Sequence, residues 1–371
     1  MTIQLFTPNF RVDECLEQIR ECLEKGWTGM GFKTDEIEVK WKEYTGLENA
    51  HFLSSATVGL HLALEIFKKE MSWQDEDEVI STPLTFVSTN HAIKHARLKP
   101  VFADVDEYLC LSPESVEKAI TPKTRAVMFV GIGGNTGQYE AIRKICTERG
   151  LFLILDAAHM AGSRLNGRHV GIDADATVFS FQAVKNLPTA DSGMICFKEQ
   201  RFDQKARKLT WLGINKDTYA RSSTQGTYKW RYDVEDVGYK YHGNSIMAGL
   251  ALVGLKYLDR DNSYRRQLAK WYREELSCSE HVHIVPVAPN CESSSHLLQI
   301  RVSNRDELLV KLNDNGVYPG VHYADNTEYK PYKQSEKLCP NARRASNEII
   351  SLPMHMGVTR SDISFIANLI K

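Results

Sequence analysis

From about residue 50 onwards, short apolar runs alternate with helix-forming segments, and this alternation constrains the fold more than any other feature of the chain. Apolar runs such as 126–131 and 151–155 are strand-sized, and segments such as 56–69 and 139–150 have helical periodicity. Short buried strands that alternate with helices are typical of a mainly parallel sheet with helices on both faces. The sequence therefore predicts an α/β fold.

A second, smaller unit is expected after the sheet-forming part. The chain has 371 residues, which is more than one compact core usually takes. Residues 246–278 predict a long helix, and strand-like HLLQIRV, helical RDELLVKLNDNG and a final helix follow. We expect a large domain at 1–245 and a smaller C-terminal α+β domain at 246–371. The polar segment 198–236, rich in Lys, Arg, Ser and Thr, predicts a long irregular excursion.

Charge and composition argue against several classes of protein. A formal net charge of −1 gives no reason to expect nucleic acid or an anionic membrane as partner. The N-terminus lacks a basic start followed by an apolar block, and no apolar run approaches the roughly 20 residues of a membrane span. The eight cysteines form no CxxC pair and no zinc-spaced cluster with histidine. We expect a cytoplasmic protein with reduced thiols and no metal.

The strongest candidate for chemistry is Asp156 followed by Lys185. Asp156 ends the apolar run LFLILD, where a carboxylate is costly to bury unless something compensates it. Lys185 comes shortly after the next strand and Ser180. Taken singly, Asp156 is as well explained as a helix N-cap and Lys185 as a solvated lysine. Taken together, in this order and between apolar strands, they favour a functional role.

Pyridoxal phosphate (PLP) chemistry requires these residue types. A lysine amine bonds covalently to the cofactor aldehyde, and an acid pairs with the pyridine nitrogen so that the ring can take up electrons. A small hydroxyl and backbone amides hold the phosphate, ideally at a helix N-terminus. Asp156, Ser180 and Lys185 supply such groups in sequence.

Here the sequence resembles a known family, the DegT-type nucleotide-sugar aminotransferases, which are PLP enzymes of fold type I. The resemblance runs from about Gly26 to the C-terminal helix. It implies a large domain with a mainly parallel seven-stranded sheet between helices, a homodimer with shared active sites, and PLP as cofactor. The segments that carry it are SSATVGLHLAL (54–64), PLTFVST (83–89), DAAHMAGSRLNGRHVG (156–171), FSFQAVKNLPTADSGMICF (179–197), GYKYHGNSIMAGLAL (238–252), GVYPGVHY (316–323) and SLPMHMGVT (351–359).

The resemblance also implies roles for individual residues. Lys185 would bind the cofactor covalently and move the proton, and Asp156 would pair with the ring nitrogen. His159 would lie beside the ring and Phe86 would stack on it. The phosphate would be held by Thr57, the amide of Val58, Ser180 and, from the other subunit, His242. For Phe86, Thr57 and His159, a core phenylalanine, a helix N-cap and a satisfied core histidine are the alternatives.

Substrate-binding groups are expected on loops, where polar and aromatic side chains recognise sugars and nucleotides. The candidates are Thr28, Gly29, Lys240, His322 and Tyr323. Three further cations in the polar segment could face a diphosphate, namely Lys216, Arg221 and Lys229.

The sequence departs from the family pattern at three places. His242 and Gly243 replace the usual arginine or asparagine and large apolar residue of the dimer-crossing element. His242 could still donate a hydrogen bond, and Gly243 suggests a looser local backbone. Ser192-Gly193 replaces Gly-Gly, and GIGGNTGQYEA (131–141) replaces a His-x-x-Gly loop. We expect these changes to alter the substrate pocket and the phosphate clamp rather than the core chemistry.

The expected reaction transfers an amine from glutamate or glutamine to a nucleotide-linked keto-sugar. By resemblance the acceptor is a 3-keto- or 4-keto-6-deoxyhexose, made for a surface polysaccharide or a secondary metabolite. The alternatives are a PLP-dependent sugar dehydratase, in which histidine replaces the lysine, and a non-catalytic PLP-fold binding protein, which would lose the lysine or the aspartate. A nicotinamide enzyme is disfavoured because no GxGxxG follows a strand and opens a helix.

Overall fold

The computed structural model describes residues 2–215, 232–333 and 339–371. Its centre is a seven-stranded sheet in which only β10 runs antiparallel to its neighbours. The prediction of an α/β fold with a mainly parallel seven-stranded sheet is therefore confirmed. In spatial order the strands are β2 (Asn49–Leu53), β10 (Gly193–Phe197), β9 (Ala176–Ser180), β6 (Phe152–Asp156), β5 (Thr124–Val130), β3 (Glu78–Ser81) and β4 (Lys99–Phe102).

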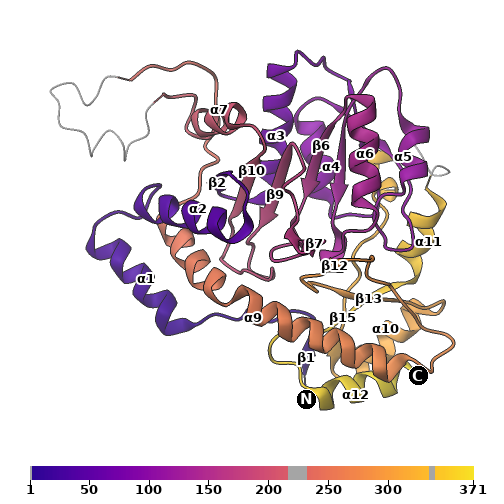
Figure 1. Ribbon diagram of the computed structural model, residues 1–371. Helices are drawn as coiled ribbons and strands as arrows, with labels where there is room; N and C mark the ends of the chain where they lie inside the picture. Colours follow the sequence, from indigo (N-terminus) through magenta and orange to yellow (C-terminus); the bar gives the residue numbers. More distant parts are fainter. Residues whose placement is uncertain (1, 216–231, 334–338) are drawn as a thin grey trace.

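Helices cover both faces of this sheet (Figure 1). Side chains alternate between the faces along each strand, so Val127 and Phe129 of β5 enter one core while Ala126 and Met128 enter the other. One face is covered by α3 (Ala56–Glu70), α4 (Val87–His95) and α7 (Gln200–Thr210). The other is covered by α2 (Phe32–Thr45), α5 (Pro113–Ala119), α6 (Tyr139–Arg149) and the first part of α9 (Ser245–Leu276).

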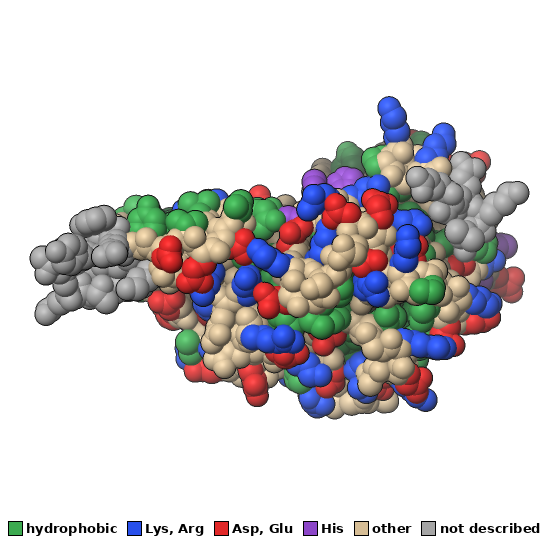
Figure 2. All heavy atoms as spheres, turned by 90° about the horizontal axis from the view of Figure 1, so that it is seen from above, with side chains coloured by type: hydrophobic (Ala, Val, Ile, Leu, Met, Phe, Trp, Pro, Cys, Tyr) green, Lys and Arg blue, Asp and Glu red, His purple; other side chains and the backbone are tan. Residues whose placement is uncertain are grey.

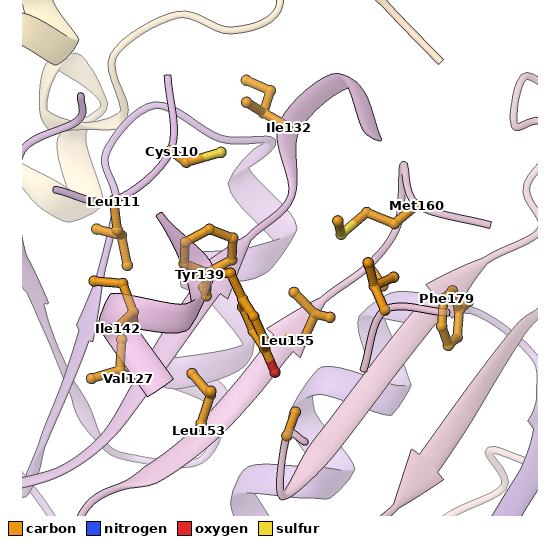
Figure 3. Packing of buried hydrophobic residues seen from close by; sticks show 14 of the residues in the cluster. Cys110, Leu111, Val127, Ile132, Tyr139, Ile142, Leu153, Leu155, Met160 and Phe179 are labelled. Carbon is orange, nitrogen blue, oxygen red and sulfur yellow. The ribbon is translucent and has the colours of Figure 1, made fainter. Parts of the chain in front are cut away.

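Figure 3 shows the second of these cores from close by. Val127, Leu153 and Leu155 point from the sheet towards Tyr139 and Ile142 of α6. All five side chains are buried, and burial of an aliphatic or aromatic side chain of this size contributes about 1.5–3 kcal/mol. This packing holds the strands whose carboxyl ends form the site described below.

A smaller unit with its own core follows (Figure 1). Three antiparallel strands, in the order β11–β13–β15, pack against α10, α12 and the second half of α9. Ala248 and Leu258 of α9 belong to the core beneath the large sheet, whereas Leu268 and Tyr272 belong to the core of the smaller unit. Because α9 carries residues of both cores, the structure gives no sharp division at its start. The predicted domain boundary at residue 245 therefore stays a prediction. The bounds are β11 (His283–Ile284), β13 (Leu298–Arg301), β15 (Ile349–Leu352), α10 (Arg305–Asp314) and α12 (Arg360–Ile370).

The N-terminal segment joins this smaller unit. β1 (Ile3–Gln4) pairs in parallel with β14 (Val317–Tyr318), which brings the start of the chain next to residues 320–323. The remaining elements are α1 (Val12–Glu24), the short strands β7 (Arg164–Leu165), β8 (Arg168–His169) and β12 (Cys291–Glu292), the 3₁₀ turns η1 (Ile132–Gly134), η2 (Asn326–Glu328) and η3 (Lys330–Tyr332), and α11 (Pro340–Glu348).

The prediction of an irregular segment at 198–236 is wrong for its first part. Residues 200–210 form α7, whose apolar stripe Phe202, Ala206 and Leu209 is buried against the sheet. The stripe has helical spacing, but polar and charged residues surround it and lower the mean hydropathy of the segment. Residues 216–231 lie outside the described residues.

Within the described ranges, no helix combines the length and apolar character that a membrane span requires. Figure 2 shows acidic and basic side chains interspersed over one face, with no large field of a single sign on its described part. This distribution agrees with the formal net charge of −1.

The prediction of a looser backbone at Gly243 is also wrong. Gly243 is buried, its N–H donates to the carbonyl of Phe52 at 2.9 Å, and the Phe52 ring lies directly over its Cα. A Cβ at this position would overlap the ring. The glycine is therefore required by close packing, and the missing large side chain is replaced by the aromatic ring of β2.

We expect Gly243→Ala to destabilise the protein by about 1–3 kcal/mol, because the ring or the backbone must move to accept the methyl group. Gly29→Ala is the matched control, since a Cβ there meets open space and Gly29 has no left-handed φ. Thermal melting monitored by circular dichroism measures both. Equal melting midpoints for the two variants would show that the Phe52 contact is not tight.

Candidate active site

A cavity of about 370 Å³ lies at the carboxyl ends of the parallel strands. Such strand ends meet at one edge of a parallel sheet, which is why ligands bind there in α/β proteins. The large sheet contributes residues 55–57, 85–89 and 156–159 and the segment from Ser180 to Lys185. The opposite wall comes from the smaller unit and the N-terminal segment, through Phe6, His296, His322 and Tyr323.

Asp156 ends β6 and is 4% exposed. Its Oδ2 accepts a hydrogen bond from the Thr89 hydroxyl at 2.7 Å, and its Oδ1 accepts one from the Ala158 N–H at 3.1 Å. Burial raises the pKa of Asp156, whereas these two hydrogen bonds and the nearby Lys185 oppose the rise. No helix begins after Asp156, so the N-cap alternative does not hold.

Lys185 lines the same cavity as Asp156 and lies on the turn after β9. Its pKa is lowered to about 8 because the amine is desolvated, and the charge of Asp156 only partly opposes this. In the described part of the chain, no carboxylate lies within 4.0 Å of its Nζ. A lysine of this kind is neutral for a sizeable fraction of the time near neutral pH and is a good nucleophile.

His159 links the two walls of the cavity. The Gly133 N–H donates to its Nδ1 at 3.1 Å, and its Nε2 lies 3.0 Å from the Tyr323 hydroxyl. Burial, reinforced by the charge of Lys185, lowers the pKa of His159 well below its usual value, so the ring is neutral. Because Nδ1 accepts, the ring proton is on Nε2 and is donated to Tyr323. The Tyr323 hydroxyl can then donate its own proton to a ligand in the cavity.

The loop that departs from the family pattern therefore reaches the core of the site. Gly133 has a φ of 63°, a conformation that glycine adopts without strain, and its amide fixes the tautomer of His159. The expectation that the changes at 131–141 leave the core chemistry untouched stays a prediction, although the loop contacts His159.

The N-terminus of α3 forms one end of the cavity. Ser55 caps the helix by accepting a hydrogen bond from the Val58 N–H at 3.3 Å, so Thr57 is not the N-cap. Thr57 and Ser180 both line the cavity, next to the helix N-terminus, which is the positive end of the helix dipole. This arrangement suits an anion such as a phosphate. Val58 is not among the residues that line the cavity, and its amide, which was predicted to bind the phosphate, donates to Ser55 Oγ.

Phe86 lies at the mouth of the cavity and is 58% exposed, which excludes the core alternative. Its ring centroid is 5.9 Å from that of Tyr323. An exposed aromatic ring at a cavity mouth can stack on a planar ligand.

Four further predicted residues lie away from this cavity. Thr28 and Gly29 accept hydrogen bonds from Ser245 through their carbonyls, and Lys240 lies 3.2 Å from the centroid of the Trp211 ring. His242 also packs on Trp211, with a centroid distance of 4.7 Å. None of the four residues lines the cavity of its own chain. Lys216, Arg221 and Lys229 lie outside the described residues.

Several residues that line the cavity had no individual role in the sequence prediction. Ser55, Thr85 and Thr89 lie inside the segments 54–64 and 83–89, which carry the family resemblance, but no function was predicted for any of the three. Phe6 and His296 come from segments without a recognised motif and stack on each other with a centroid distance of 5.4 Å. No sequence signal links them, because their contact depends on the pairing of the N-terminal strand with the smaller unit.

The cavity suits PLP. A buried acid with free acceptor sites faces it, a desolvated lysine without a carboxylate partner faces it, and a helix N-terminus with hydroxyls closes one end. These are the groups that a protonated ring nitrogen, an aldehyde and a phosphate require. Among the described residues, no group of three or more metal-binding side chains occurs.

Comparison with known proteins agrees with this fit. The model of the DegT/DnrJ/EryC1/StrS aminotransferase family matches residues 11–371. The aminotransferase TlmJ from Streptoalloteichus hindustanus is 31% identical, with 100% of this chain and 98% of that chain covered and a TM-score of 0.91. The PLP form of the putative sugar aminotransferase Spr1654 from Streptococcus pneumoniae is 25% identical, with 100% and 98% covered and a TM-score of 0.89. DesI, solved in the presence of its TDP-sugar product, is 25% identical, with 100% and 92% covered and a TM-score of 0.87.

Since Lys185 must be neutral to attack an aldehyde, we expect the rate at which PLP loads the apoprotein to rise with pH and to level off above about 8. Asp156→Asn removes the charge that raises the lysine pKa, so the midpoint should move to lower pH. Stopped-flow absorbance measures both proteins, and the ionisations of free PLP are common to them. A midpoint near the ordinary lysine value would contradict the desolvated environment of Lys185.

Proposed function

Because the chain belongs to the DegT/DnrJ/EryC1/StrS aminotransferase family and is a PLP-dependent aminotransferase, we propose that it aminates a nucleotide-linked keto-sugar, with glutamate or glutamine as the donor. The observation that carries this proposal is the single cavity shared by Asp156 and Lys185. TDP-sugar binding by DesI, a structural relative over the whole chain, supports a nucleotide-linked acceptor. The acceptor that we favour is a 3-keto- or 4-keto-6-deoxyhexose for a surface polysaccharide or a secondary metabolite.

The residues of the cavity divide the work between them. The chemistry that bound PLP supplies is electron withdrawal and temporary storage of the amine. Asp156 holds a proton on the ring nitrogen, and Thr57 and Ser180 hold the phosphate. Lys185 Nζ removes the proton from the donor carbon and returns one to the acceptor carbon, which suits an amine with a pKa of about 8.

The wall formed by the smaller unit orients the substrate. Burial lowers the pKa of His322 to about 4, so this side chain is neutral and serves as a hydrogen-bonding group rather than a charge. The Tyr323 hydroxyl, which accepts from His159, donates its proton to an acceptor atom in the cavity. Neutral donors and acceptors of this kind are suited to sugar hydroxyl and carbonyl groups.

A homodimer completes the proposal. None of the predicted residues Thr28, Gly29, Lys240 and His242 lines the cavity of its own chain, so we assign them to the active site of a second copy. Nearby apolar side chains are exposed, and Val237 is 92% accessible to solvent. Exposed apolar surface of this kind is typical of a protein interface. The dehydratase alternative is not favoured, because Lys185 is present.

The donor half of the reaction gives the direct test. We expect the PLP-loaded protein to release one 2-oxoglutarate for each active site when glutamate is added alone, with loss of its visible absorbance, because the amine stays on the cofactor. The rate at which Lys185→Ala releases 2-oxoglutarate should be lower by several orders of magnitude, since this variant lacks the group that moves the proton. Enzymatic measurement of 2-oxoglutarate checks this result. Glutamine is tested in parallel, with its keto product 2-oxoglutaramate measured by mass spectrometry.

The acceptor half is tested by adding TDP-, UDP- and GDP-linked 3-keto- and 4-keto-6-deoxyhexoses to the aminated protein. Mass spectrometry should detect one nucleotide-linked amino sugar. The visible absorbance of the protein should return at the same time. A protein that takes the amine from neither donor, or that dehydrates the sugar without consuming the donor, would contradict the proposal.

A further inference from the structure

Two buried threonines at the cavity wall form a hydrogen-bonded chain that ends on Asp156. The Thr89 hydroxyl lies 2.7 Å from Asp156 Oδ2, and the Thr85 hydroxyl lies 3.0 Å from that of Thr89. The two threonines are 1% and 2% exposed. An ionised carboxylate only accepts hydrogen bonds, so the Thr89 proton must point to Asp156. Thr89 then accepts from Thr85, and the chain has one direction, from Thr85 through Thr89 to the carboxylate.

Neither hydroxyl has a visible structural task. The N-cap of α4 is Phe86, whose side chain accepts no capping hydrogen bond, and neither threonine hydroxyl is used to cap the helix. The backbone of this turn is held by other groups instead. Asn326 donates to the carbonyl of Thr85 at 2.8 Å, and Asn90 donates to Asn326 Oδ1 at 2.9 Å. The turn therefore keeps its shape by contacts that do not involve the two hydroxyls.

The hydrogen bonds to Asp156 determine how its carboxylate is oriented. Oδ2 accepts from Thr89, and Oδ1 accepts from the Ala158 N–H at 3.1 Å. Two donors on different oxygen atoms hold the plane of the group, and a carboxylate has about four acceptor sites, so about two remain for the cavity that Asp156 lines. Charge-assisted hydrogen bonds of this type are stronger than neutral ones.

We propose that Thr89, supported by Thr85, is a positioning residue that keeps the Asp156 carboxylate ionised and oriented towards the ring nitrogen of the cofactor. The inference rests on the role proposed above for Asp156. Burial alone favours the protonated acid, and the Thr89 hydrogen bond is the strongest single interaction that lowers the pKa of Asp156. A protonated Asp156 would compete with the ring nitrogen for the same proton instead of pairing with it.

A cofactor analogue separates this role from a general effect on the fold. We would measure dissociation constants of the apoprotein for PLP and for 1-deaza-PLP, in which carbon replaces the ring nitrogen. The analogue keeps the aldehyde, the phosphate and the ring shape, so it reports every contact except the one with Asp156. The ratio of the two constants is the readout.

For Thr89→Val, which removes the hydroxyl and nearly keeps the shape, we expect PLP affinity to fall about tenfold while 1-deaza-PLP affinity is unchanged. Thr89→Ser keeps a hydroxyl and should restore the ratio. Thr85→Val should have a smaller effect, and Thr85→Val with Thr89→Val should be no worse than Thr89→Val alone, because Thr85 acts only through Thr89. Thr89→Ala provides the same test should Thr89→Val fail to fold.

Asp156→Asn distinguishes the two ways in which the idea can fail. If Asp156→Asn reduces the preference for PLP over its analogue but Thr89→Val does not, the positioning role of Thr89 is overturned and the role of Asp156 stands. If Asp156→Asn also leaves the ratio unchanged, the proposed role of Asp156 falls, and the inference falls with it. A Thr89→Val protein that binds both compounds equally less well has only a structural defect, which likewise overturns the inference.

Discussion

The structure depends on the burial of two opposite charges on one cavity without a direct ion pair between them. Asp156 and Lys185 each lose hydration, and burial moves the pKa of both towards the neutral form. If the carboxylate and the amine were in contact, they would form an ion pair with each other, and little of their capacity to bind a ligand would remain. Among the described residues, no salt bridge joins them, so each charge keeps its capacity for a partner from the cavity. The large sheet is what makes this arrangement possible, because its parallel strands end side by side.

In the hydrogen-bond network around the cavity each group has a fixed role as donor or acceptor. The neutral state of His159 determines these roles. His159 accepts from Gly133 and donates to Tyr323, while Asp156 accepts from Thr89 and Ala158. A charged imidazole at His159 would donate from both nitrogens and would compete with the Gly133 N–H. Burial and the nearby lysine prevent this. The polarity of the cavity wall is therefore determined by hydrogen bonds between residues far apart in the sequence.

How far the sequence predicts this arrangement depends on whether a contact is local. The order of strands and helices predicted the sheet, and the strand ends predicted Asp156 and Lys185, because consecutive parallel strands bring their carboxyl ends together. The family resemblance is confirmed by the match over residues 11–371. Phe6 was not predictable, since it reaches the cavity through the pairing of β1 with β14. His296 was not predictable either, since it is held there by the Gly133 carbonyl and the Asn186 side chain, which are far from it in the sequence. The helix α7 was not predicted because charged residues surround its apolar stripe. The tight packing of Gly243 was not predicted because it depends on Phe52, a ring on a distant strand.

The central claim is that Lys185 is the one amine that bonds to the cofactor. Reduction of the PLP-loaded protein with sodium borohydride makes that bond permanent, and peptide mass spectrometry identifies the labelled residue. The account predicts one phosphopyridoxyl group for each chain, on the peptide that contains Lys185, and none on the Lys185→Ala protein. A label on another lysine, or no label on a protein that binds PLP, would contradict the account.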